Sequence, residues 1–436
     1  MNKFVPVNNQ DRLNPMQPME QRAQSQTCLS YAESRQRKAE ANSQGDKRQG
    51  KPSSTNMKRN FTLTLLTAAI TCLSSTCMVA AKTRIPQSTP HLPHTVFSGW
   101  QDGFHCQGIA YDSIHGCFYM SFTTSLVKVG MDGRQLGSVK GITGHLGCIS
   151  LNPDDGRLYA SLEYKHDAIG RGIMQGTGSS NDSRTGFYVA IFDVERITSM
   201  DMDASASGVM STVYIREAVE DYNATVTSAD GSVHSHRYGC SGIDGLAVAP
   251  KWGKKDGRNM LYVAYGIYGD TLRVDNDQQV ILCYDISKWR KYETPLSPQN
   301  LHRNGPKRPT GKYFVHTGTT EWGIQNLCYD PANDMMLAAV YRGKKRGRKN
   351  FSLYALDHST RPLGSFLQLL PLGEVDESIG TRGWHFPLGS TGITSVGNGL
   401  FYVSSPQRKD GRESSTLILH RWTGDERVPL VPLSPQ

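Results

Sequence analysis

Histidines and tyrosines with the chemistry for proton transfer recur at equivalent points of this sequence. His105 and His145 each stand two residues before a repeated six-residue phrase. A histidine can remove a proton near neutral pH, and a tyrosine can return one to a leaving oxygen. We take His105 and His145 as candidate bases and Tyr164 and Tyr341 as candidate acids. The alternative is that each histidine only satisfies a backbone carbonyl.

Arginines and aromatic residues near the same points suit an acidic sugar. Arginine can bind a carboxylate through two parallel N–H groups, and aromatic rings stack on the apolar faces of sugars. The candidate ligand-binding residues are Glu163, Tyr265, Arg273, Trp322, Arg342, Trp384 and His385. Two alternatives stand beside this interpretation. The aromatic residues can pack inside the fold, and Arg273 can pair with Asp275 or Asp277 in its own loop.

A cation site is a further hypothesis. Gln107, Asp244 and Gln325 each open a copy of the repeated phrase, and Glu321 lies near the third. Oxygen donors of this kind can hold Ca²⁺, although one carboxylate with two amides offers little charge. No cofactor is certain from the sequence. A possible Ca²⁺ ion in a central channel and a channel filled with water are the two interpretations.

Several common catalytic motifs are absent from the sequence. It contains no G-x-S-x-G elbow and no H-E-x-x-H, so a serine-hydrolase or zinc-protease function has no support. The glycine-rich segment 170–178 lacks the Gly-Lys-Ser/Thr of a phosphate loop and is interpreted as an exposed loop. The basic run 344–349 is interpreted as a solvated loop.

An internal repeat indicates what positions these residues. Its phrase pairs a small residue with alternating apolar residues, and the copies span 107–112, 147–152, 244–249, 325–330 and, more weakly, 391–396. A turn rich in Pro, Asp, Asn or Gly follows each copy. A second apolar run follows each turn, at 117–121, 158–161, 261–264, 336–340 and 400–404. Short runs of this type separated by such turns predict β-hairpins.

Further strands complete most of these hairpins. They are expected at 125–129 and 135–139, 186–194 and 210–216, 279–285 and 312–316, 351–356 and 365–370, and 415–422. Residues 94–97 can supply the missing strand of the last unit and close the ring. The expected fold is an all-β propeller of four-stranded blades. Five blades are counted, and six or seven are possible; a β-sandwich would not explain the repeated phrase.

This architecture predicts where the chemistry gathers. In a hairpin, the start of the first strand and the end of the second lie on one side of the sheet. Around a propeller these positions converge on one face, which here carries the His, Tyr, Trp, Arg and acidic residues named above. The opposite strand ends are ordinary turns. We therefore expect the functional site on the first face.

The strand pattern also resembles known propellers. A small-residue inner strand, a Pro/Asp/Gly turn and then Leu-Tyr-Val-Ala, as in 261–264, resemble gluconolactonase-like and NHL-like blades. The resemblance covers most of residues 95–425 and specifies a blade, not a chemistry. A vaguer similarity links the chain to secreted carbohydrate-active propellers, including lyases that act on rhamnose–glucuronate linkages. No catalytic motif is carried over from either group.

The N-terminal residues 1–81 differ in composition from the rest of the chain. Residues 1–56 are polar and are interpreted as a disordered leader or a mis-assigned start. Residues 57–81 have the basic start, apolar run and small-residue end of a signal peptide, so a secreted or periplasmic protein is expected, with a lipoprotein or an uncleaved anchor as alternatives. A linker at 82–93, the propeller at 94–425 and a tail at 426–436 follow. The six cysteines after residue 81 are interpreted as buried free thiols, with disulfides as the alternative.

Charge and composition narrow the partners. The net charge of +9 comes mostly from the first 59 residues, because residues 82–436 hold 37 Lys and Arg against 34 Asp and Glu. Nucleic-acid binding is not indicated. A carbohydrate ligand, a monomer and no stable membrane span after signal cleavage are expected.

Three functions remain open from the sequence. The first is an enzyme acting on an acidic glycan, such as a lyase with a His base, a Tyr acid and an Arg clamp, or a glycoside hydrolase using Glu163 and Glu321. The second is a propeller that binds a glycan or a protein without turnover. The third is a metal-dependent lactonase or phosphoesterase, for which Asp244 and Glu163 or Glu321 would have to converge.

Overall fold

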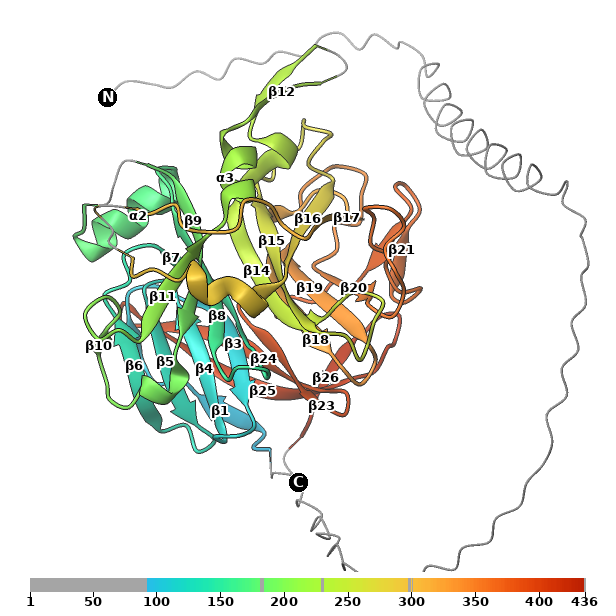
Figure 1. Cartoon of the computed structure of the whole chain (residues 1–436). Coiled ribbons are helices and arrows are strands. Elements are labelled where there is room, and N and C mark those ends of the chain that lie inside the picture. The colour runs from blue at the N-terminus through green and yellow to red at the C-terminus, as the bar shows by residue number, and fades with distance from the viewer. Residues whose placement is uncertain (1–91, 181–183, 229–230, 297–298, 300, 435–436) are drawn as a thin grey trace, which may run out of the picture. The chain divides into compact units, whose positions relative to one another are not determined.

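Five β-sheets are arranged around a central axis in the computed structural model, which describes residues 92–180, 184–228, 231–296, 299 and 301–434 (Figure 1). The inner strand of each sheet contacts the inner strand of the next, in the order β3, β7, β14, β18 and β23, and β23 contacts β3 again. The chain is therefore a five-bladed β-propeller, as its repeats predict. The predictions for residues 1–91 lie outside the described residues.

The blades follow the predicted hairpins closely. Blade 1 contains β3 (Cys106–Asp112), β4 (Cys117–Phe122), β5 (Ser125–Gly130) and β6 (Gln135–Lys140), with β10 (Met202–Asp203) added at its edge. Blade 2 contains β7 (His145–Leu151), β8 (Leu158–Tyr164), β9 (Gly186–Phe192) and β11 (Met210–Tyr214). Blade 3 contains β14 (Cys240–Pro250), β15 (Asn259–Ile267), β16 (Gln278–Tyr284) and β17 (Gly311–His316).

Blade 4 departs from the prediction at its outer edge. It pairs β18 (Glu321–Asp330), β19 (Met335–Tyr341) and β20 (Leu353–Asp357). The expected fourth strand at 365–370 forms only isolated bridges: Leu356 with Leu369, and Phe366 with both Phe314 and Leu363. It crosses from blade 4 to β17 of blade 3, so it cannot pair continuously with either. A small sheet of β21 (Glu374–Asp376) and β22 (Thr381–Gly383) follows.

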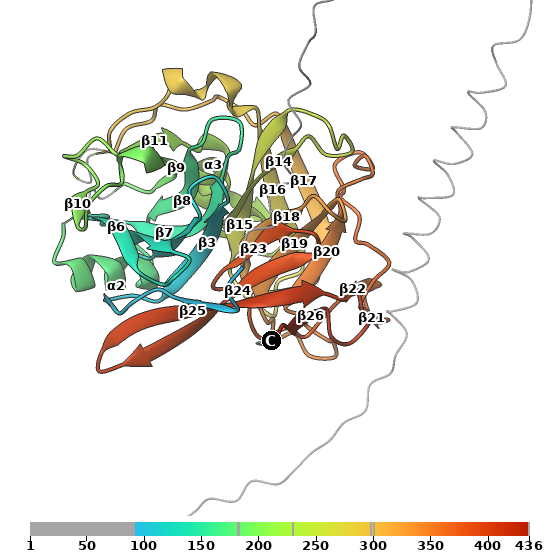
Figure 2. The same ribbon diagram turned by 90° about the horizontal axis from the view of Figure 1, so that it is seen from below.

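Blade 5 closes the ring with the N-terminal end of the propeller. It contains β23 (Ile393–Gly397), β24 (Leu400–Lys409), β25 (Arg412–Trp422) and β1 (Thr95–Phe97). Strand β1 pairs antiparallel with β25, which confirms the predicted closing strand. Strands β2 (Gln101–Asp102) and β26 (Leu430–Pro432) also pair with β25. Figure 2 shows the β24–β25 hairpin extending beyond the rest of its blade.

A buried tyrosine in four of the second strands explains why these sequences form stacked blades. Tyr119, Tyr159, Tyr262 and Tyr402 are all fully buried between sheets. Their hydroxyls still find partners, as Tyr119 donates to Asp112 and Tyr262 donates to the carbonyl of Pro250. A large ring can thus be buried without leaving a polar atom unpaired.

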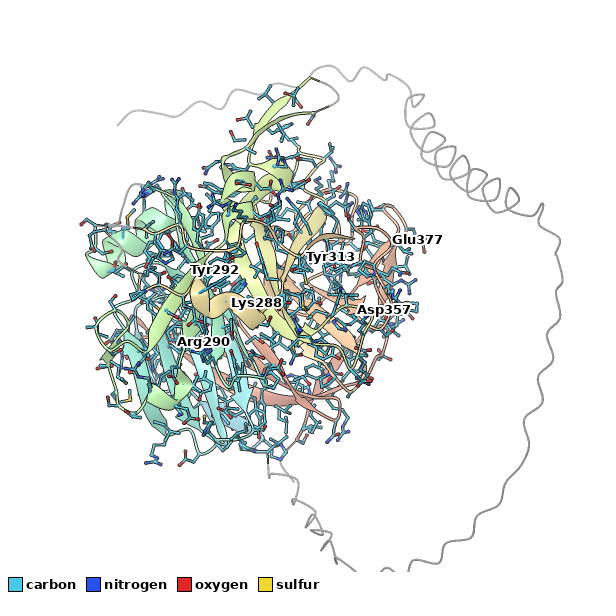
Figure 3. All side chains as sticks on the ribbon, viewed as in Figure 1. Lys288, Arg290, Tyr292, Tyr313, Asp357 and Glu377 are labelled. Atoms are coloured by element: carbon cyan, nitrogen blue, oxygen red, sulfur yellow. The ribbon has the colours of Figure 1, made fainter. Side chains whose placement is uncertain are left out.

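The remaining elements are insertions between strands. They are α2 (Ala168–Thr177), α3 (Arg216–Asn223), the hairpin β12 (Thr225–Thr227) and β13 (Val233–Ser235), and the 3-10 helices η1 (Val194–Arg196), η2 (Arg237–Gly239) and η3 (Ile286–Lys291). Figure 3 labels the exposed Lys288 and Arg290 on η3, on either side of the buried Trp289 that fixes this helix to the fold. Within the described chain, no helix is long and apolar enough to cross a membrane.

The six cysteines of the propeller are free and buried. Burial raises the pKa of the Cys106 thiol to about 12 and that of Cys148 to about 11, so both thiols stay protonated at neutral pH. Hence the cysteines behave as small apolar residues of the core.

Candidate functional site

A cavity of about 380 Å³ opens at the face of the propeller where the sequence predicts the site. We call it the axial pocket. Its polar lining consists of His105, Gln107, Thr123, His145, Lys165, Asp244, Gln325 and Tyr341. Its apolar lining consists of Phe104, Trp322 and the helix residues Ala168, Ile169, Gly172 and Ile173. A mostly apolar hollow with a few converging polar groups is the usual form of a small-molecule site.

β-Bulges explain why the first residue of the repeated phrase faces this pocket. The β3–β4 ladder skips a residue between Cys106 and Gly108, and the β18–β19 ladder skips one between Ile324 and Asn326. The skipped residues are Gln107 and Gln325. A similar shift frees Asp244 on β14. An unpaired bulge residue is re-aimed relative to its neighbours, which turns these side chains toward the axis.

Glycines beside the bulges let the inner strands approach one another. A Cβ atom placed on Gly108 would lie 2.8 Å from the Cα atom of Cys148 on the next inner strand. A Cβ atom on Gly245 would lie 2.7 Å from a side-chain carbon of Ile324. At these two positions of the phrase, close packing at the axis therefore requires glycine.

The charged centre of the pocket wall is built around His145. Its Nδ1 atom lies 3.4 Å from the Oε2 atom of Glu163 and 3.5 Å from the Oδ1 atom of Asp244. Glu163 lies one residue before the end of β8, directly opposite His145 in the ladder. Asp244 comes from the inner strand of the next blade. The carboxyl end of one hairpin and a bulge of its neighbour thus enclose one imidazole.

Lys165 supplies the balancing positive charge. Its ammonium group lies 2.8 Å from the Oε2 atom of Glu163 and donates a hydrogen bond of 2.8 Å to the carbonyl of Ser241. The lysine side chain is 3% exposed, and the Glu163 side chain is 1% exposed. Glu163 also accepts a hydrogen bond from the backbone N–H of Ile243. A buried ion pair with these extra hydrogen bonds is strongly coupled to the surrounding fold.

The pKa values of Glu163 and Asp244 are shifted in opposite directions. Burial would raise the pKa of Glu163, but the charge of Lys165 and the contact with His145 outweigh it and hold the pKa below its usual value. Burial, together with the charge of Glu163, raises the pKa of Asp244 to about 6. Two neighbouring carboxyls whose pKa values are driven apart are a mark of acid–base sites.

The second histidine of the polar lining is His105. Burial and the nearby His145 lower the pKa of His105, so the ring is neutral at pH 7. The amide nitrogen of Gln107 lies 3.2 Å from its Nε2 atom and donates 3.0 Å to the hydroxyl of Thr123. Burial and the charge of Asp244 raise the pKa of Tyr341, which remains a proton donor.

Helix α2 covers one side of the pocket, where the sequence analysis expected an exposed loop at 170–178. Asp167 caps its first turn by accepting from the N–H of Gly170, and Gly178 ends it in a left-handed conformation. Ile169 and Ile173, four residues apart, both face the pocket. The glycine content concealed a helix whose two ends are capped by side chain and glycine.

The arginines expected to bind a carboxylate are held elsewhere. Arg273 is buried against Asp275 and donates to the carbonyls of Ser235 and His236. This arrangement matches the alternative pairing with Asp275. Arg342 is exposed and reaches the carbonyl of Lys349. Neither arginine lines the axial pocket.

Four aromatic or histidine candidates also lie outside the pocket lining. Tyr265 is fully buried and donates to Asp221, and Trp384 is buried against Trp422 with its ring N–H on the carbonyl of Asp425. Tyr164 is buried beside Tyr188, and its hydroxyl lies 3.4 Å from that of Thr143. His385 is exposed and stacks on Phe351. Packing inside or on the fold accounts for all four.

The basic run 344–349 is a fixed loop, contrary to the sequence interpretation. Lys345 is buried on Asp277, Arg348 reaches the same carboxylate, and Lys349 pairs with Glu374. Lys344 pairs with Glu321 at 3.1 Å, which places Glu321 beside this loop and not in the pocket lining. Acidic partners distant in sequence thus pair with four of the five basic residues of this run.

Sequence reasoning did not select Lys165, Thr123, Phe104 or helix α2. Lys165 follows Glu163 at a strand end that was selected, but a lysine is normally exposed. Only the buried Glu163 explains its position. The spacing of Asp167, Ile169, Ile173 and Gly178 was the available signal for the helix.

The possible metal ligands can be compared with the donors that are present. Among the described residues, His145, Glu163 and Asp244 offer ligand atoms that lie within 4.8 Å of one another. Ca²⁺ prefers oxygen donors, and this set includes an imidazole nitrogen. Glu163 is already in an ion pair with Lys165, and the amide nitrogens of Gln107 and Gln325 donate to neighbouring groups. The set fits a transition metal better than Ca²⁺.

Comparisons with known proteins add little to this description. No family model matches the chain, and no curated protein matches it. Similar solved structures include the Dos1 propeller, with 11% identity, a TM-score of 0.30 and coverage of 76% of this chain and 58% of that one. The chain thus spans less than two thirds of that protein.

Two further structures are equally distant. Hydrazine synthase of Kuenenia stuttgartiensis has 11% identity, a TM-score of 0.31 and coverage of 80% and 70%. U3-55K has 9% identity, a TM-score of 0.29 and coverage of 74% and 98%. Likeness at this level carries no argument about activity, and the propeller assignment rests on the strand pairing described above.

Proposed function

We propose that this propeller is a glycan-active enzyme that performs acid–base chemistry in the axial pocket. The observation that carries the proposal is His145, held between Glu163 and Asp244 at the pocket wall. A carboxylate on Nδ1 keeps the proton there and leaves Nε2 as a base, the role that a carboxylate plays behind a catalytic histidine in other enzymes.

The remaining lining fits a sugar. Phe104, Trp322 and Tyr341 offer aromatic surface, and Thr123 and the amides of Gln107 and Gln325 offer hydrogen-bonding groups. Sugars combine apolar ring faces with hydroxyls, and both kinds of contact are therefore present. Tyr341 is the group in the lining that can return a proton to a leaving oxygen, whereas the neutral His105 can only accept one.

Charge favours a neutral glycan over the acidic one expected from sequence. Glu163, Asp167 and Asp244 surround one lysine, and the ammonium of Lys165 already contacts Glu163 and Ser241. No arginine is present among the described lining residues. A uronate carboxylate would meet negative charge, so hydrolysis of a neutral glycosidic bond is the proposed reaction, and β-elimination is the alternative outcome.

One assay tests this proposal. The purified protein is incubated with neutral and uronate-containing polysaccharides while new reducing ends and absorbance at about 235 nm, which reports elimination, are measured. We expect reducing ends without the absorbance change. The variant Asp244→Asn should lower kcat/KM at least about 100-fold, whereas Arg342→Ala should leave it unchanged. The absence of turnover on every glycan, or full activity of Asp244→Asn, would refute the proposal.

A metal-dependent hydrolase is the second candidate, because three ligand atoms converge within 4.8 Å. A transition metal there would activate water for attack on an ester or lactone. Repeating the assay with lactones and phosphoesters, after chelation and after addition of Mn²⁺ or Zn²⁺, separates the two candidates. Activity that chelation abolishes and metal restores would favour the second.

We also propose that the protein works outside the cytoplasm as a carbohydrate-binding monomer without affinity for nucleic acid. The signal-like segment 57–81 and the nearly balanced charge of residues 82–436 support this. N-terminal sequencing of exported protein should find Lys82 first, and the solution mass should be that of one chain.

A further inference from the structure

A second cavity lies beside the axial pocket. It has a volume of about 290 Å³, and its polar lining includes Gln101, Thr124, Ser125, Thr143 and Thr177. We call it the side pocket. Asp102 and Lys140 also line it, and each forms an ion pair, with Arg412 and Asp201 respectively. Apart from these paired charges, the polar side chains of the side pocket are four hydroxyls and the amide of Gln101.

The two pockets share their walls. Thr123 lines the axial pocket, and the next residue, Thr124, lines the side pocket. On helix α2, Ile173 faces the first and Thr177, one turn later, faces the second. Two more segments behave in the same way. Residues 101–102 line the side pocket and 104–105 line the axial pocket, and residues 140–143 line the side pocket and 145 lines the axial pocket. Four chain segments thus run from one cavity into the other.

Phe104 marks the boundary. It lies between these two groups of lining residues in the chain, and its ring packs against Gly176 of α2. A Cβ atom on Gly176 would lie 2.9 Å from the Cζ atom of that ring. Gly176 itself falls between Ile173 and Thr177. An aromatic ring at the junction of two sugar-sized hollows is the arrangement that an extended glycan needs.

We propose that the axial and side pockets bind successive units of one oligosaccharide, with the ligand crossing Phe104 and the second unit in the side pocket. This inference rests on the proposed function, and it narrows the substrate to a neutral chain of at least two sugar units. The neutral hydroxyls and amides of the side pocket would bind sugar hydroxyls, and its paired charges supply no free ion for a charged group.

Binding as a function of ligand length tests the inference. The full chain is applied to an array of neutral and uronic oligosaccharides of one to four units, and each ligand bound is titrated by calorimetry. We expect affinity to rise about tenfold or more from one unit to two or three, which corresponds to two or three added hydrogen bonds.

Variants on one helix provide the matched control. Thr177→Tyr fills the side pocket from an exposed helical position, and Gln175→Tyr places the same side chain two residues away, outside both linings. Thr177→Tyr should reduce the length-dependent gain to about threefold or less without changing the affinity for one unit. Gln175→Tyr should keep the gain. Thermal melts confirm that both variants fold.

The outcomes separate the two proposals. Equal affinity for one unit and for longer ligands, or a gain that survives in Thr177→Tyr, overturns the side-pocket inference and leaves the proposed function standing. No binding of any array ligand overturns both. Loss of all binding in Thr177→Tyr, including that of a single unit, overturns the separation of the two subsites.

Discussion

The two mouths of the central channel are built from the same five inner strands, yet they differ in chemistry. At the axial pocket, the first residue of the repeated phrase is freed by a bulge, as with Asp244. At the opposite mouth, a smaller cavity of about 140 Å³ is lined by the later residues of the phrase, among them Tyr111, Ser150 and Cys328. No Asp, Glu, Lys, Arg or His is among its described lining residues.

Two aspartates at opposite ends of the repeated phrase illustrate the difference. Asp112 ends its phrase and accepts hydrogen bonds from the N–H groups of Ile114 and His115, which shapes the turn. Burial would raise its pKa, but the hydrogen bonds from His115 outweigh it and lower the pKa. Asp244 begins its phrase, and its pKa is raised. A carboxylate satisfied by donors supports structure, whereas one placed beside another carboxylate is costly and remains available for proton transfer.

The largest effect should come from removing the positive charge of Lys165 at the axial pocket. Lys165→Met leaves Glu163 buried without its partner, which should cost about 3–5 kcal/mol in the free energy of unfolding. The exposed pair Lys140–Asp201 is the matched control, and Lys140→Met should cost less than about 1 kcal/mol. Urea denaturation measures both.

A double variant sharpens this test. Lys165→Met combined with Glu163→Gln should recover most of the lost stability, because the uncompensated charge is gone. If the double variant is as unstable as the single one, packing of the lysine stem, and not the ion pair, holds the axial mouth together.

The turn that follows β3 should respond in stability alone. Asp112→Asn removes part of a hydrogen-bonded turn and should cost about 1–3 kcal/mol, measured by denaturant unfolding. Its kcat/KM on the glycan found in the activity assay should match that of the unmodified protein. A loss of activity from this variant would mean that the two mouths are coupled.

The pH dependence of stability should distinguish the two aspartates. The pKa of Asp244 is raised in the folded protein, so its contribution is fully present below about pH 4 and is lost as the pH rises through about 6. Asp244→Asn should therefore gain on the order of 2 kcal/mol relative to the unmodified protein between pH 4 and pH 7. Asp112 has a lowered pKa, so its contribution is lost as the pH falls. Melting temperatures measured across this pH range check the assignment. If it is wrong, the melting temperatures of Asp244→Asn and of the unmodified protein will change equally with pH.

The smallest effect is expected just outside the axial mouth. Arg342 follows Tyr341 directly in sequence, but only Tyr341 lines the pocket. Arg342→Ala should change the free energy of unfolding by less than about 0.5 kcal/mol and leave kcat/KM within about twofold. A larger loss of kcat/KM would extend the site beyond the pocket and restore the arginine clamp expected from sequence.

Much of the fold could be predicted because the signal is local and repeated. Short apolar runs, turn residues and the recurring small residue located nearly every strand of the blades, including closing strand β1. The prediction of a fourth strand in blade 4 was wrong, because residues 365–370 bridge two blades. Phe366 pairs with Phe314, and Leu369 pairs with Leu356. Pattern alone cannot show to which sheet an apolar run will pair.

The candidate site divides along the same line. The first position of the phrase placed Gln107, Asp244 and Gln325 at the axis, and the two histidines beside it also line the pocket. The ends of the second strands were less informative. The side chain of Tyr265 lies in the core, and that of Arg273 pairs with Asp275. Lys165, in contrast, lines the pocket.

The sequence by itself determined the propeller architecture, the closing strand and the residues that begin each inner strand, because these depend on a period that the chain repeats. Its count of five blades left six or seven possible. The tertiary structure decided which neighbours those residues meet. His145, Glu163 and Asp244 come from three strands. The capping residue of helix α2, Asp167, accepts a hydrogen bond from Tyr268, which is 101 residues away in the chain. Contacts between such distant segments fix the direction of each side chain and the charge around it, and no local pattern contains them.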